Sequence, residues 1–197
     1  MADSARDYWD TQAATFDDAA DHGLRDRDVR RAWRDLLLPF LPPAPATVVD
    51  LGCGTGSLSV LLAQVGYDVR GVDLSARMVE AAIAKAAAAG VVARFEQADA
   101  SDPPFQAGSC DVVLARHVVW ALPDPDAAMS RWADLLRPNG RLILVEGSWS
   151  TGAGLTADAC EALVLRHRAA ATVRHLQEPL LWGGPIDDDR YLIVSTH

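Results

Sequence analysis

A glycine-rich loop just after a short apolar run is the part of this sequence best suited to hold a ligand. Asp50 closes the run, and Gly52, Gly54 and Gly56 follow at alternate positions. Glycines in such a loop let the backbone turn sharply and let a ligand approach more closely than a Cβ would allow. The spacing is G-x-G-x-G, and Ser57 stands where the loop of a dinucleotide site has its third glycine. The loop therefore departs from the dinucleotide pattern.

Three aspartates follow successive apolar runs and indicate what the ligand carries. Asp50 would repel a pyrophosphate beside the glycine loop, whereas it suits a cationic amine. Asp73 ends the second run, where an acid accepts hydrogen bonds from ribose hydroxyls, and Asp99 follows the third, where it can accept from the amine of adenine. Taken singly, Asp73 and Asp99 would also suit a cap, a turn or a loop. Together the acids favour an amino-acid-bearing nucleotide such as S-adenosylmethionine over NAD.

Apolar runs that alternate with helical stretches place these groups at one edge of a parallel sheet. The runs are β-branched and nearly continuous, as strands covered on both faces are. We expect strands over residues 47–51, 68–72, 91–97, 111–115 and 142–145. Helices are expected over residues 57–64, 76–89 and 125–136, with Ser75 and Gly90 as caps of the second and Asp124 as the N-cap of the third. This rhythm predicts an α/β fold with right-handed crossovers, which gathers the strand-end acids at one edge.

The two ends of the chain lie outside this rhythm. Upstream, residues 28–38 form an amphipathic helix that follows a more polar segment. Beyond residue 146 we expect a loop, a helix and two strand-like runs, over residues 147–155, 156–167, 171–176 and 191–196. Because no helix separates the last two runs, they predict an antiparallel pair at the sheet edge. We expect a single domain over residues 1–197, made of a lid segment, a cofactor-binding core and a C-terminal helix and strand pair, at residues 1–25, 26–146 and 147–197.

Composition and charge narrow the class of protein. With 197 residues, 50% of them hydrophobic, the chain fits one globular domain. The formal net charge of −9 disfavours nucleic acid and anionic membranes as partners. No apolar run approaches the ~20 residues of a membrane span, and the polar start does not fit a signal peptide. We expect a cytoplasmic protein, in which an exposed C-terminal edge strand could pair two copies as a homodimer.

The cysteines indicate no metal site and no disulfide framework. Cys53, Cys110 and Cys160 are widely spaced and form no CxxC pair. Cys53 fits a small residue in a tight loop rather than a nucleophile, and the other two fit packing positions.

In this order the motifs resemble the class I S-adenosylmethionine-dependent methyltransferases, and they are closest to the small-molecule group that includes ubiquinone- and menaquinone-biosynthesis enzymes. The matching motifs lie at residues 49–56, 71–78, 99–100, 111–113 and 136–142. The resemblance implies a doubly wound, Rossmann-like sheet of order 3-2-1-4-5-7-6, with the last strand antiparallel and helices on both faces. The implied cofactor-binding positions, from the methionine part through the ribose to the adenine, are Gly52, Cys53, Gly54, Gly56, Asp73, Leu74, Met78, Asp99 and Ala100. The implied product is S-adenosylhomocysteine.

The acceptor is expected where the fourth strand runs into Arg116 and His117. A base is needed only when the acceptor carries a proton that must leave. His117 is the first candidate because the ordinary pKa of histidine is near neutrality, and Glu146 at the end of the fifth strand is its rival. Packing, or lining the cofactor pocket, is the alternative role for the histidine. Arg116 would contact the cofactor or orient an anionic acceptor.

Aromatic residues and the N-terminal segment complete the expected pocket. Trp120 and Trp149 follow the fourth and fifth strands and are suited to wall an acceptor or to face a sulfonium. Tyr8 and Phe16 belong to a segment that resembles the mobile cover of many family members; an amphipathic helix packed on the sheet is the alternative. His22 from this segment would reach over the substrate or lie on the surface.

The function most consistent with the sequence is methyl transfer to an oxygen, nitrogen or carbon atom of a small molecule by in-line displacement. A nicotinamide-dependent oxidoreductase fits less well, because the third glycine and a Tyr-x-x-x-Lys pair are absent. Methylation of nucleic acid or protein is opposed by the acidic charge and by the lack of a [DNS]-P-P-[YF] run after the fourth strand. A non-catalytic module that binds S-adenosylmethionine stays open, since catalysis by proximity needs few obligatory residues.

Overall fold

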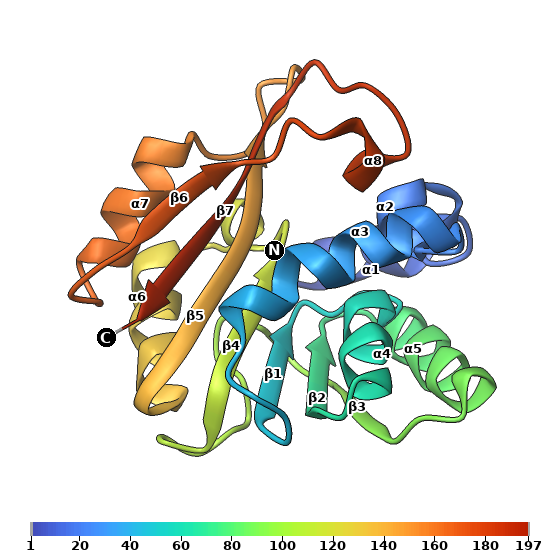
Figure 1. The fold of residues 1–197 in the computed structure, drawn as a ribbon, viewed down its shortest axis with the longest axis horizontal. Coiled ribbons are helices and arrows are strands. Elements are labelled where there is room, and N and C mark those ends of the chain that lie inside the picture. The colour runs from blue at the N-terminus through green and yellow to red at the C-terminus, as the bar shows by residue number, and fades with distance from the viewer. Residues whose placement is uncertain (1, 197) are drawn as a thin grey trace.

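The computed structural model describes residues 2–196 and shows a sheet of seven strands between two layers of helices (Figure 1). The strands are β1 (Thr47–Leu51), β2 (Asp68–Asp73), β3 (Ala93–Gln97), β4 (Cys110–Arg116), β5 (Leu136–Ser148), β6 (Thr172–His175) and β7 (Asp189–Thr196). Their order is β3-β2-β1-β4-β5-β7-β6. β7 runs antiparallel to β5 and β6, and the other neighbours are parallel. The expected fold class and strand order are confirmed.

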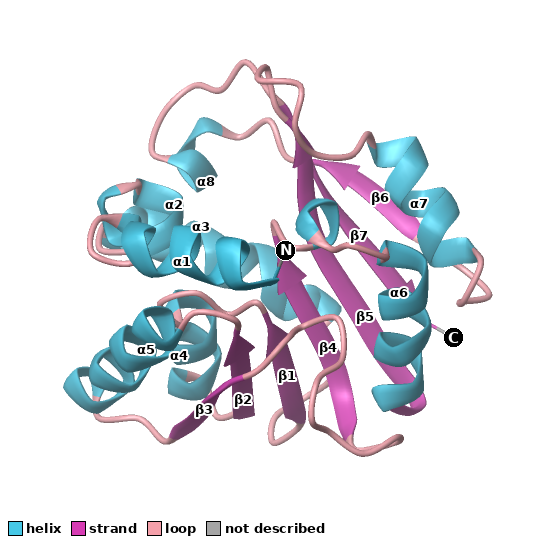
Figure 2. Ribbon diagram, turned by 180° about the vertical axis from the view of Figure 1, so that it is seen from behind, coloured by secondary structure: helices cyan, strands magenta, loops and turns pink. Residues whose placement is uncertain are grey.

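Helices cover both faces of the sheet. The α-helices are α1 (Ala2–Gln12), α2 (Ala20–Gly23), α3 (Arg27–Leu37), α4 (Ser57–Gln64), α5 (Ala76–Ala89), α6 (Pro125–Leu135), α7 (Ala157–Leu165) and α8 (Pro179–Trp182). Short 3-10 turns are η1 (Phe16–Asp18), η2 (Leu38–Phe40) and η3 (Val119–Ala121). Core residues of α3, α4 and α8 pack on one face, and those of α6 and α7 on the other (Figure 2).

The expected caps of the central helices are present. Ser75 begins α5, and its Oγ accepts a hydrogen bond from the Met78 N–H at 3.1 Å. Gly90 ends the same helix in the left-handed conformation, with φ of 66°. Asp124 caps α6 by accepting from the Ala127 N–H at 3.0 Å. These local signals fix the helix bounds, and the helices in turn set where each strand can end.

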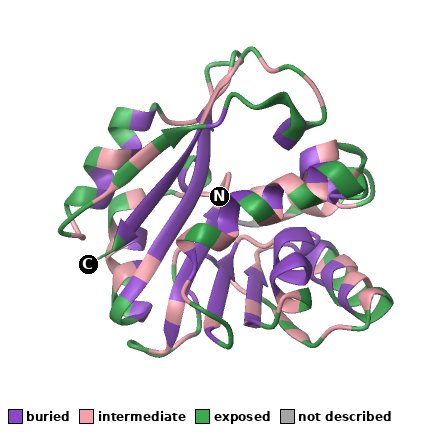
Figure 3. Ribbon diagram, in the orientation of Figure 1, coloured by how far each residue is buried: buried purple, intermediate pink, exposed green. Residues whose placement is uncertain are grey.

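Neighbouring residues of each central strand point to opposite faces of the sheet. Val48 and Val112 pack toward α3 and α4, whereas Val49 and Val113 pack toward α6 and α7. Both faces are therefore dry, which explains the nearly continuous apolar runs. Figure 3 shows the central strands as the most buried part of the molecule.

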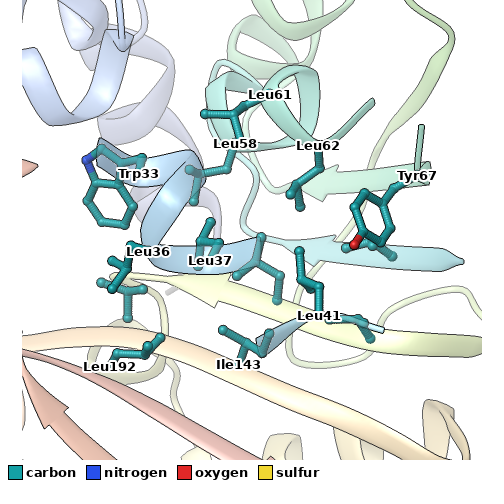
Figure 4. Close-up of a cluster of buried hydrophobic side chains, with 14 of the residues drawn as sticks. Trp33, Leu36, Leu37, Leu41, Leu58, Leu61, Leu62, Tyr67, Ile143 and Leu192 are labelled. Atoms are coloured by element: carbon teal, nitrogen blue, oxygen red, sulfur yellow. The ribbon is translucent and has the colours of Figure 1, made fainter. Parts of the chain in front are cut away.

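A cluster of large apolar side chains fastens α3 to the sheet. Trp33 and Leu37 of α3 lie over Leu58 of α4 and Ile143 of β5 (Figure 4). Trp33 is fully buried, and its Nε1–H donates to the Leu181 carbonyl in α8 at 2.8 Å. Because α3 follows directly on the N-terminal segment, this cluster fixes where that segment crosses the sheet edge.

Most expected elements agree with the structure to within two residues, and two features differ more. β5 begins at Leu136, earlier than expected, because Leu136 pairs with Cys110 and the strand resumes pairing at Arg141. The residues between them, including Pro138-Asn139-Gly140, form an irregularity in the strand rather than a loop before it. The single-turn helix α8 lies inside the expected loop between the last two strands. A helix of four residues has too few positions to show a 3.6-residue period.

The N-terminal helices lie beyond the carboxyl ends of β1 and β2, in both views of the ribbon (Figures 1 and 2). α1 rests against α5, and α8 reaches α2 and α3 from the opposite end of the chain. Within residues 2–196, no helix combines the length and the apolarity that crossing a bilayer requires. β6 is an edge strand, and pairing of two copies through it stays a prediction.

Candidate active site

A cavity of about 990 Å³ opens at the carboxyl ends of the strands, under the N-terminal helices. This volume is at the upper end of the range of about 300–1,000 Å³ that is usual for small-molecule sites. Most residues expected in the site line it: Tyr8, Phe16, His22, Asp50, Gly52, Cys53, Gly54, Asp73, Leu74, Met78, Asp99, Ala100, Arg116, His117, Trp120 and Trp149. Gly56 and Glu146 do not.

The glycine loop forms a tight cradle at one end of the cavity. Gly52 has φ of 68°, and a Cβ there would lie 2.4 Å from Cγ2 of Val118. The loop is held against β2, because the Cys53 N–H donates to the Val72 carbonyl at 2.9 Å. The Gly54 N–H donates to Oδ2 of Asp73 at 2.8 Å. A side chain at position 52 would therefore not fit in the cradle. The hydrogen bonds donated by the Cys53 and Gly54 N–H groups set the shape of the cradle.

The strand-end acids differ in burial and in hydrogen-bond partners. Desolvation raises the pKa of the buried Asp50 to about 6, and its Oδ2 accepts from Oγ of Ser59 at 2.5 Å. Burial also raises the pKa of Asp73, although hydrogen bonds from the Ser75 and Gly54 N–H groups oppose it. Asp99 is exposed and accepts from the Ser101 N–H at 2.8 Å. A cationic group beside Asp50 would stabilise the ionised carboxylate against the cost of burial, so this carboxyl is suited to a ligand amine.

Cys53 and Gly56 have structural rather than chemical roles in the glycine loop. Burial raises the pKa of the Cys53 thiol well above its ordinary value, so the thiol stays protonated and is a poor nucleophile. Gly56 is the N-cap of α4 and faces Ala82, which places it behind the cradle.

His117 lies at the other end of the cavity, in a left-handed backbone conformation with φ of 59°. Its N–H donates to the Val145 carbonyl at 2.8 Å, which holds the turn after β4. Within the described chain, its buried Nε2 has no hydrogen-bond partner. Burial, followed by the Arg116 charge, lowers the pKa of His117 well below its ordinary value. The imidazole is therefore neutral at pH 7 and able to accept a proton.

The structure contradicts the base role expected for Glu146. The side chain is fully buried and lies outside the cavity lining. Its Oε1 accepts the Val118 N–H at 2.8 Å and the Val119 N–H at 2.7 Å. Desolvation raises its pKa to about 8, so the carboxyl is mostly protonated at neutral pH. Glu146 instead holds the turn that carries His117 and Trp120.

The N-terminal segment covers the cavity, and a network that sequence patterns did not reveal holds it there. The Lys85 ammonium lies 2.9 Å from Oδ2 of Asp17 and donates to Oγ1 of Thr55 at 2.8 Å and to Oγ of Ser57 at 2.6 Å. Lys85 thereby joins η1 to the glycine loop. One signal in the sequence marks it, since it is a lone charge in an alanine-rich stretch of α5.

A second set of contacts holds the cover at α1 and α2. Oδ1 of Asp10 accepts from Oγ of Ser75, next to the ribose position expected at Asp73. The Arg116 guanidinium donates to the Asp21 carbonyl and lies 5.1 Å from the Trp33 ring centroid. Arg116 therefore lines the cavity and fastens the cover, and α1 rests on α5 rather than on the sheet.

Asp21, His22 and His117 place one possible metal-ligand atom each within 4.8 Å of one another. Sequence spacing gave no sign of this cluster, and no metal was expected. The Arg190 guanidinium lies 3.7 Å from Oδ2 of Asp21, and Arg116 bonds to the carbonyl of the same residue. Two fixed positive charges beside the cluster disfavour a cation, so we assign it no metal.

Comparisons with known proteins agree with this geometry. Residues 49–144 match the family model described as a methyltransferase domain. The chain is 34% identical over 154 residues to nocamycin O-methyltransferase of Saccharothrix syringae, an alignment that covers 70% of this chain and 55% of that protein. It is 37% identical over 105 residues to a ubiquinone biosynthesis O-methyltransferase of Xanthomonas axonopodis, covering 53% of this chain and 44% of that protein. The chain thus spans about half the length of these relatives.

Solved structures show the same fold. A geranyl diphosphate methyltransferase in complex with S-adenosylmethionine has a TM-score of 0.72 to this chain at 22% identity, with 84% of each chain covered. The sheet order, the glycine loop and the matched residues 49–144 agree with one another. The chain belongs to the class I S-adenosylmethionine-dependent methyltransferases.

Proposed function

We propose that this chain transfers a methyl group from S-adenosylmethionine to a small-molecule acceptor. The observation that carries the proposal is the continuity of one cavity. At one end it has a side-chain-free cradle and three strand-end acids, and at the other a buried, neutral histidine. The named O-methyltransferase relatives support this assignment.

The lining residues fit S-adenosylmethionine at the cradle end. Asp50 matches the amine of the methionine part, and Asp73 still has free lone pairs for ribose hydroxyls after accepting two backbone bonds. Asp99 and Ala100 line the side expected to hold adenine, with the apolar Met78 beside them. A Cβ at position 52 would close the cradle. When bound, the cofactor supplies a methyl group that its sulfonium already activates.

The chain's own residues then align the acceptor, exclude water and take a proton. Tyr8 and Phe16 of the cover line the cavity, where they would reduce the access of water to a bound acceptor. Nε2 of His117 receives the proton when the acceptor is a hydroxyl. Positioning of this kind contributes on the order of 7–11 kcal/mol to lowering a barrier.

Two alternatives have less support. An oxidoreductase would need a diphosphate beside Asp50, and none of the relatives named above is an oxidoreductase. A non-catalytic binding module would have no use for the unpartnered Nε2 of His117, which is costly to bury without a partner.

Isothermal titration with S-adenosylhomocysteine and with NADH tests the proposal. We expect one S-adenosylhomocysteine site per chain and no NADH binding. Transfer of a tritiated methyl group to at least one member of a small-molecule panel should follow. Binding of NADH alone, or tight cofactor binding with no turnover across a broad panel, would count against the proposal.

A further inference from the structure

Aromatic rings form a continuous wall at the acceptor end of the cavity. The Trp149 and Trp120 ring centroids lie 5.6 Å apart, and Trp149 meets the His117 ring at 5.2 Å with an interplanar angle of 88°. The Trp120 Nε1–H donates to the His117 carbonyl at 3.0 Å, which ties the wall to the turn that carries the histidine. All three residues line the cavity. A flat ligand placed on this wall would bring its substituent next to His117.

The backbone at Gly154 fixes the orientation of Trp149. A Cβ at this position would lie 2.0 Å from the Gly147 carbonyl oxygen, 2.5 Å from Cε3 of Trp149 and 2.6 Å from its Cζ3, so the indole and the Gly147 backbone both pack directly against the Gly154 backbone. The Trp149 N–H donates to the Ala153 carbonyl at 3.0 Å, which closes the same turn. The Trp149 side chain is therefore held in one orientation, as a residue that selects a ligand by its shape must be.

The cover adds further aromatic rings to the same cavity. Tyr8 and Trp9 both line it, with ring centroids 5.0 Å apart and planes 75° apart. Phe16 lines it as well and stacks on His22 at 4.3 Å. Aromatic rings prefer to stack or to meet edge to face, so a cavity lined in this way favours a flat aromatic ligand over a puckered aliphatic one.

The charges that line the acceptor end of the cavity disfavour aromatic ligands that carry a cationic amine. The carboxylates that line the cavity in the described chain are Asp50, Asp73 and Asp99, and all three belong to the cofactor end. Beside His117 the lining charge is the Arg116 guanidinium. A cationic amine would face this guanidinium, and the nearby Asp21 carboxylate does not line the cavity and already lies 3.7 Å from the Arg190 guanidinium. A developing phenolate would instead be stabilised by Arg116.

The chemistry of His117 selects among hydroxyl compounds. Its imidazole is a weakened base, because burial and Arg116 oppose its protonation. Such a base can take the proton of a phenol, whose pKa is about 10 as in tyrosine. It cannot readily take the proton of an aliphatic alcohol, which resembles water with a pKa of about 15.7.

We propose that Trp149, held flat by Gly154, selects the acceptor, and that the class it selects is a flat aromatic ring bearing a phenolic hydroxyl. This inference rests on the proposed methyl transfer. The hydroxyl proton goes to Nε2 of His117, and an oxygen lone pair forms the bond to the methyl carbon. The electron pair of the broken carbon–sulfur bond stays on sulfur, which leaves a neutral thioether, an aryl methyl ether and an imidazolium.

Isothermal titration of two matched probes into the protein saturated with S-adenosylhomocysteine tests the proposal. 1-Naphthol and decahydro-1-naphthol share a ten-carbon skeleton, but only the first is flat and acidic. We expect wild-type protein to bind 1-naphthol at least tenfold more tightly. Trp149→Leu and Gly154→Ala should each weaken 1-naphthol binding at least tenfold, with S-adenosylhomocysteine affinity unchanged.

Gly152→Ala is the matched control for Gly154→Ala. Gly152 lies in the same turn with φ of 83°, and nothing lies within 4 Å of a Cβ placed there. Gly152→Ala has the same left-handed backbone strain but collides neither with Trp149 nor with the Gly147 carbonyl, so 1-naphthol affinity should not change. Because Gly154→Ala would also displace the Gly147 backbone, Trp149→Leu is the variant that tests the indole itself. If Gly154→Ala does not fold, Trp149→Leu decides alone.

Equal binding of the two probes, or unchanged 1-naphthol affinity in Trp149→Leu, would overturn the proposal. A wild-type protein that does not bind S-adenosylhomocysteine would instead overturn the proposed function. The two failures are therefore distinguishable within one set of titrations.

Discussion

The two ends of the cavity are built in different ways. The cofactor end takes its main groups from a short stretch, between Asp50 and Asp73, and backbone hydrogen bonds set its shape. The acceptor end joins His22, His117 and Trp149, which come from the cover, from the turn after β4 and from the loop after β5. Backbone hydrogen bonds hold the turns of His117 and Trp149, but contacts between rings from these separate segments form the wall of this end.

This difference explains why one end could be predicted from sequence motifs and the other could not. A ligand shared by a family needs the same backbone turn and the same strand-end acids. An acceptor wall made of side chains can change through single substitutions without disturbing the sheet. The two ends should therefore fail separately when each is altered.

His117→Asn is expected to have the largest effect and to fall on the acceptor end alone. Asparagine tolerates the left-handed backbone that His117 adopts, so the turn should persist. Loss of the base should lower kcat by about 10²–10⁴-fold. S-adenosylhomocysteine affinity, measured by titration, should not change. A variant with full activity would remove the base from the mechanism.

The pH profile of methyl transfer by the wild-type protein tests the proposed role of His117. A base acts in its neutral form, and burial together with the Arg116 charge lowers the pKa of His117 below the ordinary 6.5. The rate should therefore be independent of His117 ionisation at pH 7 and should fall only well below pH 6.5. An acidic limb centred at or above pH 6.5 would contradict the lowered pKa.

Gly52→Ala should damage the cofactor end. A left-handed alanine costs about 1–2 kcal/mol, and its Cβ would also collide with Val118. We expect S-adenosylhomocysteine affinity to fall about 100-fold, or about 2.8 kcal/mol. Gly90→Ala is the control, because Gly90 has φ of 66° but nothing within 4 Å of its Cβ. Equal losses in both variants would point to backbone strain alone.

Lys85→Met tests the connection between the cover and the glycine loop. The substitution leaves Asp17 without its closest cation and removes the hydrogen bonds from Lys85 to Thr55 and Ser57, while the Thr55 hydroxyl still donates to Asp17. We expect S-adenosylhomocysteine to dissociate about tenfold faster and limited proteolysis to cut the N-terminal segment sooner, since losing a partner of a partly buried polar group costs on the order of 1–3 kcal/mol. Arg94→Met, which removes an exposed ion pair with Asp68, should leave both measurements unchanged.

Glu146→Gln should have the smallest effect on the reaction and a visible effect on stability. The folded-state pKa of Glu146 is about 8, against an ordinary value of 4.5, so the folded state holds an extra proton between these pH values. Wild-type stability should fall as pH rises through this window, by up to about 1.4 kcal/mol per unit. Glutamine still accepts the Val118 and Val119 N–H groups but does not ionise. Urea unfolding at several pH values should show a flatter profile for the variant; identical slopes would refute the shift.

Much of the fold was predictable because its signals are local. The cap at Ser75, the end at Gly90 and the cap at Asp124 each act within one helical turn. The strands were visible because both faces of the sheet are covered. β5 and α8 were harder, since an irregular strand start and a single-turn helix have no clear period.

The structural role of Glu146 could not be predicted from the sequence. Its place at the end of a strand resembled that of Asp50 and Asp73, and its residue type suited a base. Burial and two backbone N–H groups turned it into a support for the neighbouring turn. Lys85 shows the opposite case, since it stood in an alanine-rich helix and proved to hold the cover.

By itself the sequence determined the cofactor end, because a glycine turn and the acids at strand ends follow from chain neighbours and from the carboxyl edge of a parallel sheet. Only the tertiary structure decided what surrounds His117. His22, Trp149 and the Trp182 ring reach it from distant parts of the chain, and Gly154 orients one of them. Such contacts depend on how the whole chain crosses the sheet, and no local spacing encodes them.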